Sequence, residues 1–461
     1  MIVIGAGISG LTAAHAALEA GVDVLVLEAD DAPGGKLRSS RIDGYTIDWG
    51  PNGFLANVPD TLALVRSLGL DEALLGATDE ARARYLYWDG ALRALPTTPG
   101  AFLRSELVSP PGKLRALAEF LIPHARKREE SVHDFVARHF GFEVARLFAG
   151  PFVQGISAGD ARQLSLDAMF PRFRALEASH GSLLRGLLAA RTAARAAGGA
   201  PGEPRLTSFR DGGVQRLTDA LASALGARIR TGARVVELRS RGRSGSTGTV
   251  EVRTVDGETF ESDTVILALP AFAAADLLRE EAPEAAAALD GIRYVDVHVL
   301  GFGFDRVDVP HPLDGFGYLV PRGQRVRSLG ALWSSVVFPD QAPDGKVGLR
   351  VLAGGALDPG FTELEDDVAI AAIRRDLEAT MGITAAPDMV HVTRWRRGIP
   401  QFALGHVERV RSAREGVQKA LPGVRLAGNY LDGVGVNDAV RTASAAARAL
   451  LAPAETAARV L

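Results

Sequence analysis

The sequence predicts an α/β fold, and its first residues carry most of the evidence. Residues 1–4 form an apolar run with the composition of a short buried strand. The glycine-rich turn GAGISG at 5–10 follows, and then an alanine-rich stretch, 11–20, that is typical of a helix. A second apolar run at 22–27 ends at Glu28. Strand, glycine turn, helix and strand in this order predict a Rossmann-like βαβ unit.

Each residue type in this unit suits a dinucleotide. Gly5 permits the tight turn, Gly7 lets the backbone approach a pyrophosphate, and Gly10 lets the helix pack closely on the strand. The helix N-terminus offers free N–H groups and the positive end of its dipole to the phosphates. Glu28 can accept a hydrogen bond from a ribose hydroxyl and would repel a 2′-phosphate. We therefore predict a dinucleotide site; the alternative is a purely structural turn.

Composition excludes several classes of protein. The chain has 461 residues, of which 47% are hydrophobic, so it can bury the cores of two or three domains. The net charge of −3 gives no indication of nucleic-acid binding. There is no cysteine, which excludes disulfides, thiolate metal sites and a flavin tethered through sulfur. The histidines lack metal-ligand spacing, so we expect no metal. The nucleotide strand begins at residue 1 and no apolar run reaches about 18 residues, so we expect a cytoplasmic protein without a membrane-spanning helix.

The next elements follow in order. Two strands are predicted around the turn Asp89-Gly90 in the segment 80–95. The pattern is helical from about 102 to 200, with a basic amphipathic stretch at 113–128 and a Pro/Gly-rich linker at 189–204.

The second half alternates between strands and helices. A helix is predicted at 212–226, strands at 233–238, 249–254 and 263–270, strands and turns over 292–355, a helix at 363–381, and a strand, a glycine-rich turn and an alanine-rich helix over 424–461. Because nucleotide-type elements occur at the start, the middle and the end, we predict one sheet assembled from separated segments.

Further glycines favour FAD over NAD. A glycine pair at 34–35 precedes Lys36, and the segment GPNG occupies 50–53. A long FAD molecule runs past such additional backbone. No second G-x-G-x-x-G occurs in a βαβ context, so oxygen or a quinone is expected as electron acceptor rather than nicotinamide. The run at 426–439 enters a helix near Asn437, whose N-terminus would point at the flavin ring.

Longer motifs indicate a family. The stretches VIGAGISGL, WGPNGF, FVQGISAGD, RDGGVQRL, GIPQFALGH and AGNYLDGVGVND resemble the flavin-containing amine-oxidase superfamily, and within it the oxygen-dependent protoporphyrinogen oxidases of haem biosynthesis.

The resemblance implies a fold of three parts. The Rossmann-like FAD-binding domain is discontinuous and comprises residues 1–75, 205–270 and 390–461. An α+β substrate-binding domain comprises 76–100 and 271–389, and a mainly helical domain comprises 101–204.

The resemblance implies non-covalent FAD contacts at Gly5, Ala6, Gly7, Ile8, Ser9, Gly10, Glu28, Lys36, Gly50, Pro51, Asn52, Gly53, Val235, Asn429, Val434, Gly435 and Val436. It implies substrate contacts at Arg84, which would bind a propionate, and at Asn52, Gly155, Phe316, Leu332 and Leu352. Many relatives have an arginine where this chain has Ala32, and Lys36 and Arg38 are the candidates to replace it.

The same resemblance implies an activity. The chain would oxidise protoporphyrinogen IX to protoporphyrin IX with oxygen as acceptor, with the flavin and not a side chain taking the hydride. It implies that the helical domain can rest on a membrane, here the inner face, and a homodimer is a further candidate assembly.

Three alternatives stay open. Coproporphyrinogen III has two more propionates and would favour extra Lys or Arg in the pocket, whereas the wall residues Phe316, Leu332 and Leu352 are apolar. The other two are a different amine-oxidase-like flavoenzyme and a non-catalytic FAD-binding protein.

Overall fold

A five-stranded parallel sheet collects strands from the start, the middle and the end of the chain. The computed structural model describes residues 1–121, 129–196, 205–241 and 248–451. The strand order in the sheet is β10 (Ile229–Arg230), β2 (Leu25–Leu27), β1 (Ile2–Ile4), β14 (Val265–Leu267) and β20 (Val424–Leu426). All neighbouring pairs are parallel. The prediction of one sheet assembled from discontinuous segments is confirmed.

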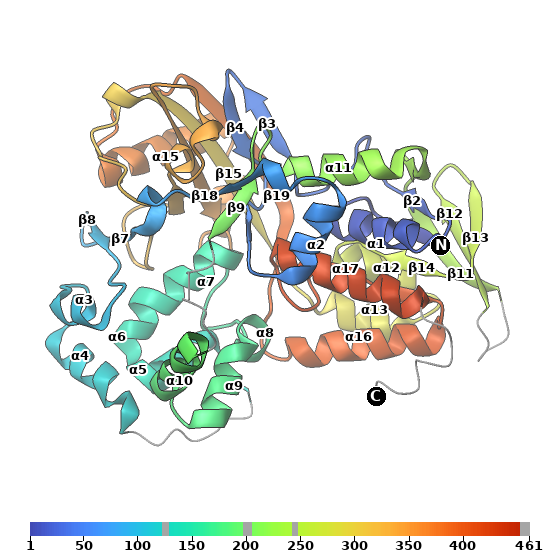
Figure 1. Ribbon diagram of the computed structural model, residues 1–461, viewed down its shortest axis with the longest axis horizontal. Helices are drawn as coiled ribbons and strands as arrows, with labels where there is room; N and C mark the ends of the chain where they lie inside the picture. The colour runs from blue at the N-terminus through green and yellow to red at the C-terminus, as the bar shows by residue number, and fades with distance from the viewer. Residues whose placement is uncertain (122–128, 197–204, 242–247, 452–461) are drawn as a thin grey trace.

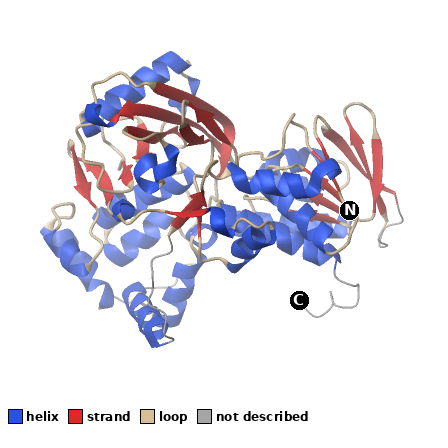
Figure 2. Cartoon of the chain, turned by 45° about the horizontal axis from the view of Figure 1, so that its top comes forward, coloured by secondary structure: helices blue, strands red, loops and turns tan. Residues whose placement is uncertain are grey.

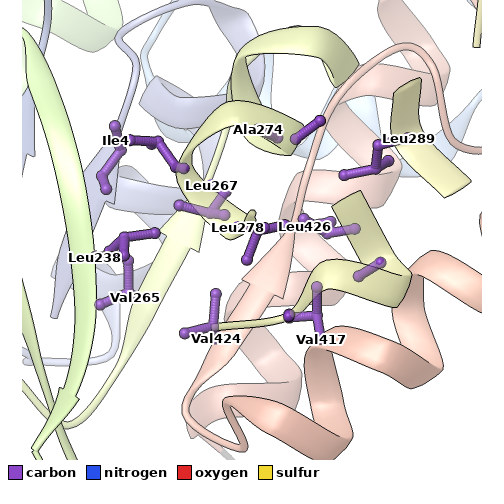
Figure 3. Packing of buried hydrophobic residues seen from close by; sticks show 14 of the residues in the cluster. Ile4, Leu238, Val265, Leu267, Ala274, Leu278, Leu289, Val417, Val424 and Leu426 are labelled. Atoms are coloured by element: carbon purple, nitrogen blue, oxygen red, sulfur yellow. The ribbon is translucent and has the colours of Figure 1, made fainter. Parts of the chain in front are cut away.

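Helices cover both faces of this sheet, so its short strands are buried on both sides. Val3, Val26 and Ile266 pack on one face, and the neighbouring residues Ile4 and Leu267 pack on the other. The first face is covered by α1 (Ile8–Glu19), α2 (Pro59–Ser67), α11 (Gln215–Leu225) and α17 (Val436–Leu451). The second is covered by α12 (Ala271–Leu278), α13 (Pro283–Asp290) and α16 (His406–Ala420), whose packing Figure 3 shows.

Three small sheets accompany this core. They are β11 (Val235–Arg241) with β12 (Thr249–Thr254) and β13 (Thr259–Ser262), β3 (Ser39–Ile42) with β4 (Tyr45–Asp48), and β9 (Leu206–Phe209) between β5 (Phe54–Leu55) and β6 (Leu74–Gly76).

The second large sheet is mostly antiparallel and has seven strands, visible in red in Figure 2. Its helix α15 (Asp366–Met381) packs on one face through Ile373 and Leu377, against Phe302 and Val351 of the strands. The strand order is β19 (Met389–Pro400), β15 (Tyr294–Asp305), β18 (Lys346–Gly354), β17 (Ser328–Leu332), β16 (Gly317–Leu319), β7 (Arg84–Trp88) and β8 (Ala91–Ala94); the short helix α14 (Ser334–Val337) follows β17.

The segment between β8 and β9 is helical, as expected, and Figure 1 shows it as a group of helices apart from the parallel sheet. Five of the helices begin after a serine or threonine whose side chain accepts from a backbone N–H of the first turn, for example Ser131. The helices are α3 (Pro99–Arg104), α4 (Pro110–Leu117), α5 (Val132–Phe140), α6 (Phe142–Val144), a π-helical turn at Ala145–Ala149, α7 (Gly150–Ser157), α8 (Leu166–Met169), α9 (Pro171–His180) and α10 (Leu183–Ala196).

Two local predictions in this segment need correction. The basic stretch predicted at 113–128 is not one helix, since α4 ends at Leu117 and a short 3-10 turn follows; its residues 122–128 lie outside the described residues. The linker predicted at 189–204 is wrong at its start, because α10 continues to Ala196; residues 197–204 lie outside the described residues.

Two contacts bear on the predicted domain limits, which remain a prediction. Strand β19 lies at the start of the segment 390–461, which was assigned to the FAD-binding domain. It pairs with β15 of the seven-stranded sheet and not with a strand of the parallel sheet. Helices α12 and α13 were assigned to the substrate part, yet they pack on the parallel sheet. The predicted domain limits near residues 270 and 390 would therefore fit these contacts better if both lay further toward the C-terminus.

Candidate flavin and substrate site

The glycine turn after β1 has the geometry that its sequence predicts. Gly5 has φ +98°, and a Cβ there would lie 2.6 Å from the carbonyl oxygen of Ala268. A Cβ on Gly10 would lie 1.8 Å from the carbonyl oxygen of Gly5, so only glycine lets α1 pack this closely. A Cβ on Gly7, by contrast, would meet open space. Because α1 begins at Ile8 without a side-chain cap, the N–H groups of its first turn are available to an anion.

Glu28 lies at the end of β2, beside the glycine turn. Its Oε2 accepts from the backbone N–H of Ala6 at 2.5 Å, and its Oε1 accepts from that of Asp30 at 2.9 Å. The carboxylate is therefore held beside the phosphate loop, and each of its oxygens keeps a lone pair for a ribose hydroxyl. Val235 begins β11 close by, since the N–H of Ala233 donates to the carbonyl oxygen of Glu28 at 2.7 Å.

The second glycine pair packs directly on the first turn. The N–H of Gly34 donates to the carbonyl oxygen of Ala6 at 2.8 Å, and a Cβ on Gly35 would lie 3.1 Å from the Cα of Gly7. The predicted segment at 50–53 is equally close, because a Cβ on Gly50 would lie 2.5 Å from the carbonyl oxygen of Lys36. These glycines let three backbone segments pack closely into a cradle around the first turn, where a Cβ on Gly7 would meet open space. Open space beside backbone N–H groups is what the phosphates of a dinucleotide need.

Lys36 connects this cradle to the seven-stranded sheet. Its Nζ donates to the carbonyl oxygen of Gly398 in β19 and lies 5.7 Å from the centre of the Tyr294 ring. Burial lowers the pKa of the Lys36 ammonium to about 8. The lysine is therefore a cation whose charge can change near neutral pH, placed between the two sheets.

Arg38, one of the two candidates to replace an arginine at position 32, lies beside that position. Its Nη2 donates to the carbonyl oxygen of Ala32 at 2.5 Å, and its guanidinium lies 5.6 Å from the Trp49 ring. Its positive charge is therefore held against the backbone of Ala32, and its role toward FAD stays a prediction.

The C-terminal turn ends at the N-terminus of α17, one residue before the predicted start. Val436 is the first helical residue and is buried, while Val434 and Gly435 precede it and Asn429 is half-buried in the turn. The Nδ2 of Asn437 donates to the carbonyl oxygen of Leu55 at 3.0 Å, so this helix end lies close to the segment that follows Gly53. Two helix N-termini, those of α1 and α17, therefore belong to the same layer of helices on the parallel sheet.

The predicted substrate residues share one face of the seven-stranded sheet. Arg84 of β7 pairs with Gly317 of β16, and Gly317 pairs with Leu332 of β17. Leu332 in turn pairs with Arg350 of β18, and Leu352 is two residues further along that strand. Paired residues, and residues two apart in a strand, point to the same side. This face is opposite to the one that α15 covers.

The other two predicted wall residues lie beside this face. Phe316 precedes β16, and the guanidinium of Arg84 lies 5.0 Å from the centre of its ring. Gly155 belongs to α7, and a Cβ there would lie 2.8 Å from Cδ2 of Leu319. Arg84 itself is exposed, and Asn52 is half-buried in the segment between the two sheets.

Arg350 is the main residue of this region that the sequence analysis did not select. It lies within the apolar part of strand β18 that follows Lys346. Its Nε donates to the carbonyl oxygen of Asp48 at 3.2 Å, and its Nη2 donates to that of Gly50. Burial lowers the pKa of the Arg350 guanidinium and raises that of the Asp48 carboxyl. A single charge inside the run VGLRVLAG is the signal that could have identified it.

Comparison with known proteins agrees with this geometry. The model of the family described as flavin containing amine oxidoreductase matches residues 8–451. The chain belongs to this family. It is therefore an FAD protein, and the glycine cradles, Glu28 and the two helix N-termini fit that cofactor. The set of residues that contact FAD stays a prediction.

Named relatives of similar length exist. The chain is 34% identical to a chloroplastic protoporphyrinogen oxidase of Oryza sativa subsp. japonica, over 96% of this chain and 86% of the relative. It is 31% identical to a coproporphyrinogen III oxidase of Bacillus subtilis (strain 168), over 97% and 96% respectively.

Solved structures share the fold. A candidate protoporphyrinogen oxidase from Exiguobacterium sp. 255-15 superposes with a TM-score of 0.83 at 25% identity, over 97% of this chain and 98% of that one. An engineered putrescine oxidase superposes with a TM-score of 0.73 at 18% identity, over 98% of both chains. At this identity the likeness shows a shared fold alone.

Proposed function

We propose that this protein oxidises a porphyrinogen, and that its substrate is protoporphyrinogen IX, which it converts to protoporphyrin IX with oxygen as the final acceptor. The observation that carries the proposal is the sheet face that brings Arg84, Leu332 and Leu352 together beside the segment at 50–53. A flat apolar macrocycle with carboxylates at its edge needs an apolar wall and a cation at one end, and this face offers both. Full-length relatives named as porphyrinogen oxidases support the substrate class.

The oxidation of a porphyrinogen requires no catalytic acid or base from the protein. Bound FAD supplies a two-electron acceptor at the site. A porphyrinogen has sp³ meso carbons between electron-rich pyrroles, so loss of hydride leaves a cation that the pyrroles delocalise, and no strong protein base is required. Overall the substrate loses six hydrogen atoms, which three molecules of oxygen take up as hydrogen peroxide.

The side chains therefore bind and orient. Arg84 would hold a propionate through two parallel N–H donors, with its guanidinium supported by the Phe316 ring. Leu332 and Leu352 would exclude water from one side of the macrocycle, and Asn52 would line its edge near the flavin. Holding the meso carbon close to the flavin in the reactive orientation would accelerate the oxidation without an acid–base side chain.

Coproporphyrinogen III is the second candidate, and a different observation favours it. Arg146, Arg162 and Arg322 surround a hollow next to α7, which is the kind of surface that additional propionates require. The Bacillus subtilis relative carries that substrate in its name.

Anaerobic mixing tests the function. We expect either porphyrinogen to bleach the visible flavin absorption of the FAD-loaded protein, and air to restore it while porphyrin fluorescence rises. A flavin that neither porphyrinogen reduces would overturn the proposal. An amine that reduces it instead would favour another flavoenzyme of the family.

We also propose that the helical segment contacts a membrane surface from one side. Within the described residues, no helix has the length and apolar character needed to cross a bilayer. Leucines of α3, α4 and the turn after it are nevertheless exposed, among them Leu114 at 70% and Leu121 at 83%. The basic side chain of Lys113 lies beside them and suits anionic lipid, whereas the Arg115 guanidinium donates to the carbonyl oxygens of Arg138 and His139. Flotation with anionic vesicles tests this: Leu114→Ser with Leu121→Ser should reduce the bound fraction, and unchanged binding would contradict it.

A further inference from the structure

Part of the motif GIPQFALGH serves neither the flavin site nor the predicted substrate face. Residues 401–405, which we call the connecting segment, join the end of β19 to the start of α16. Strand β19 belongs to the seven-stranded sheet, whereas α16 packs on the parallel sheet. The connecting segment therefore passes from one sheet to the other.

The helical part of the chain is bonded along the connecting segment. The N–H of Ser165, at the start of α8, donates to the carbonyl oxygen of Phe402 at 2.7 Å. The N–H of Gly405 donates to the carboxylate of Glu129, with 2.9 Å to its Oε1. All three parts of the fold therefore meet at this segment.

Gln401, the first residue of the connecting segment, holds the end of α7. Its side chain is buried, and its Nε2 donates to the carbonyl oxygen of Ser157, the last residue of α7, at 2.9 Å. The carbonyl oxygen of Ile399 is a longer contact of the same Nε2, at 3.3 Å. A Cβ on Gly159 would lie 2.5 Å from the Oε1 of Gln401. The last carbonyl groups of a helix have no partner within it, and here a side chain from a distant segment supplies a donor.

The residue after α7 has a conformation that non-glycine residues rarely adopt. Ala158 has φ +50°, in the left-handed region. Its carbonyl oxygen accepts from the N–H of Ala356 at 2.8 Å, and a Cβ on Gly355 would lie 2.4 Å from the same oxygen. Such a conformation persists only where the surrounding contacts fix it. The end of α7 therefore has a defined position against the turn that follows β18.

The end of α7 also borders the predicted substrate face. Leu319 of β16 lies on the same side of the seven-stranded sheet as Arg84. A Cβ on Gly155 of α7 would lie 2.8 Å from Cδ2 of this leucine. Ala158 belongs to the same apolar cluster as Leu352. A displacement of α7 would therefore change what a ligand on this face meets.

We propose that Gln401 is a positioning residue for the oxidation. It fixes the end of α7, and the end of α7 determines how the macrocycle lies on the face of Arg84 and Leu352 relative to the cofactor. The inference rests on the proposed porphyrinogen oxidation and extends it to a residue that contacts neither substrate nor flavin. Loss of its amide should therefore slow the step in which the substrate reduces the flavin, and leave the reaction of reduced flavin with oxygen unchanged.

Separate measurement of the two half-reactions of the FAD-loaded protein tests this role. In Gln401→Met, a thioether of similar length replaces the amide and cannot donate to Ser157. We expect the rate of anaerobic flavin reduction by protoporphyrinogen IX to fall about tenfold to hundredfold, because a small misplacement of reacting atoms is costly. Reoxidation of the reduced flavin by oxygen should change less than about twofold.

Thr380→Val is the matched control. The Thr380 hydroxyl is buried on the face that α15 covers, where it bonds to the hydroxyl of Tyr318 and the carbonyl oxygen of Asp376. Its loss should lower the urea midpoint and leave both half-reactions at the parent rate. If Gln401→Met reduces its flavin as fast as Thr380→Val does, the proposal is wrong. Equal slowing of both half-reactions in Gln401→Met would assign the defect to the flavin site and would also overturn it.

A distance measurement tests the placement of the helices without catalysis. The chain has no cysteine, so cysteines introduced at the exposed positions Arg172 of α9 and Val368 of α15 carry spin labels at these two sites alone. We expect a broader or shifted distance distribution in Gln401→Met than in the parent, and an unchanged one in Thr380→Val. A distribution in Gln401→Met identical to that of the parent would contradict the inference. If Gln401→Met does not fold, Gln401→Asn, whose amide is one methylene shorter, takes its place with the same expected outcomes.

Failure of this inference and failure of the proposed function are distinguishable. A parent protein whose flavin neither porphyrinogen reduces contradicts the function, and the spin-label comparison still decides whether Gln401 holds the helices in place. A parent that reacts normally, with a Gln401 variant that matches Thr380→Val in both half-reactions, contradicts only the positioning role.

Discussion

The Nε of Arg350 lies 3.2 Å from the carbonyl oxygen of Asp48, so a strand of the seven-stranded sheet is bonded to the chain that leads into the predicted flavin segment. The same guanidinium donates to the carbonyl oxygen of Gly50. This side chain therefore helps to hold the wall that carries Leu352 close to the segment at 50–53, together with Trp395 of β19, whose Nε1 donates to the carbonyl oxygen of Trp49 at 2.7 Å. Gly301 helps this close approach, since a Cβ there would lie 2.9 Å from Ile47 of β4.

Replacing this arginine should weaken both stability and FAD binding. Arg350→Met leaves two largely buried carbonyl oxygens without their donor, which costs about 2–3 kcal/mol. We expect a lower urea midpoint and a higher Kd for FAD, measured by flavin fluorescence. Arg350→Lys should recover part of both, because an ammonium can reach one carbonyl but lacks the fork. Arg375→Met, at an exposed position of α15, is the control; a variant of Arg350 that behaves like this control would show that the contact is dispensable.

Glu28 should act on cofactor affinity and not on turnover. A charge-assisted hydrogen bond to a ribose hydroxyl contributes about 1.5–3 kcal/mol, so Glu28→Ala should raise the Kd for FAD about tenfold to hundredfold. At saturating FAD the rate should return close to that of the parent. Glu19→Gln, at the far end of α1, controls for the loss of a charge. An unchanged Kd for FAD would remove Glu28 from the site.

Lys36 should make FAD affinity depend on pH. Its pKa of about 8 means that the ammonium is charged below that pH and becomes neutral above it. If Lys36 faces the FAD phosphates, as the resemblance implies, its attraction to them is present at pH 7 and declines as the pH rises toward 9. We expect the Kd for FAD to rise over this range in the parent and to stay nearly flat in Lys36→Arg, whose charge persists. If the parent and the arginine variant have the same pH profile, Lys36 does not contribute its charge to FAD binding.

Arg84 should act on the substrate and leave the flavin spectrum unchanged. If it binds a propionate, Arg84→Ala should lower kcat/KM for protoporphyrinogen IX about tenfold to hundredfold, chiefly through KM. Arg84→Lys should recover only part of the loss. The neighbouring Arg82 is exposed and pairs with Asp79, so Arg82→Ala is a matched control. A kcat/KM for Arg84→Ala within twofold of the parent would make Arg84 an ordinary surface residue.

The sequence predicted local units better than long-range contacts. The strand, turn and helix at the N-terminus could be predicted because each glycine meets a specific steric demand, such as the 1.8 Å approach at Gly10. The assembly of one parallel sheet from distant segments followed from recurring nucleotide-type elements. The end of the basic stretch at Leu117 was missed because amphipathic spacing continues across a break in the helix.

Contacts between the sheets could not be predicted from composition. Arg350 and Lys36 bond to backbone carbonyl oxygens about 300 or more residues away in sequence, and a carbonyl group carries no signal of residue type. The common face of Arg84, Leu332 and Leu352 depends on strand register, which the pairing of four neighbouring strands determines. The predicted limits near 270 and 390 depend on the same kind of contact, because packing and pairing decide which sheet α12, α13 and β19 join.

The most direct test of the central claim is aerobic oxidation of protoporphyrinogen IX and coproporphyrinogen III by the FAD-loaded protein, followed by porphyrin fluorescence and by hydrogen peroxide. We expect porphyrin formation from both substrates, with three molecules of peroxide for each porphyrin, and a higher kcat/KM for protoporphyrinogen IX. Fluorescence that rises no faster than with FAD alone, for both porphyrinogens, would contradict it.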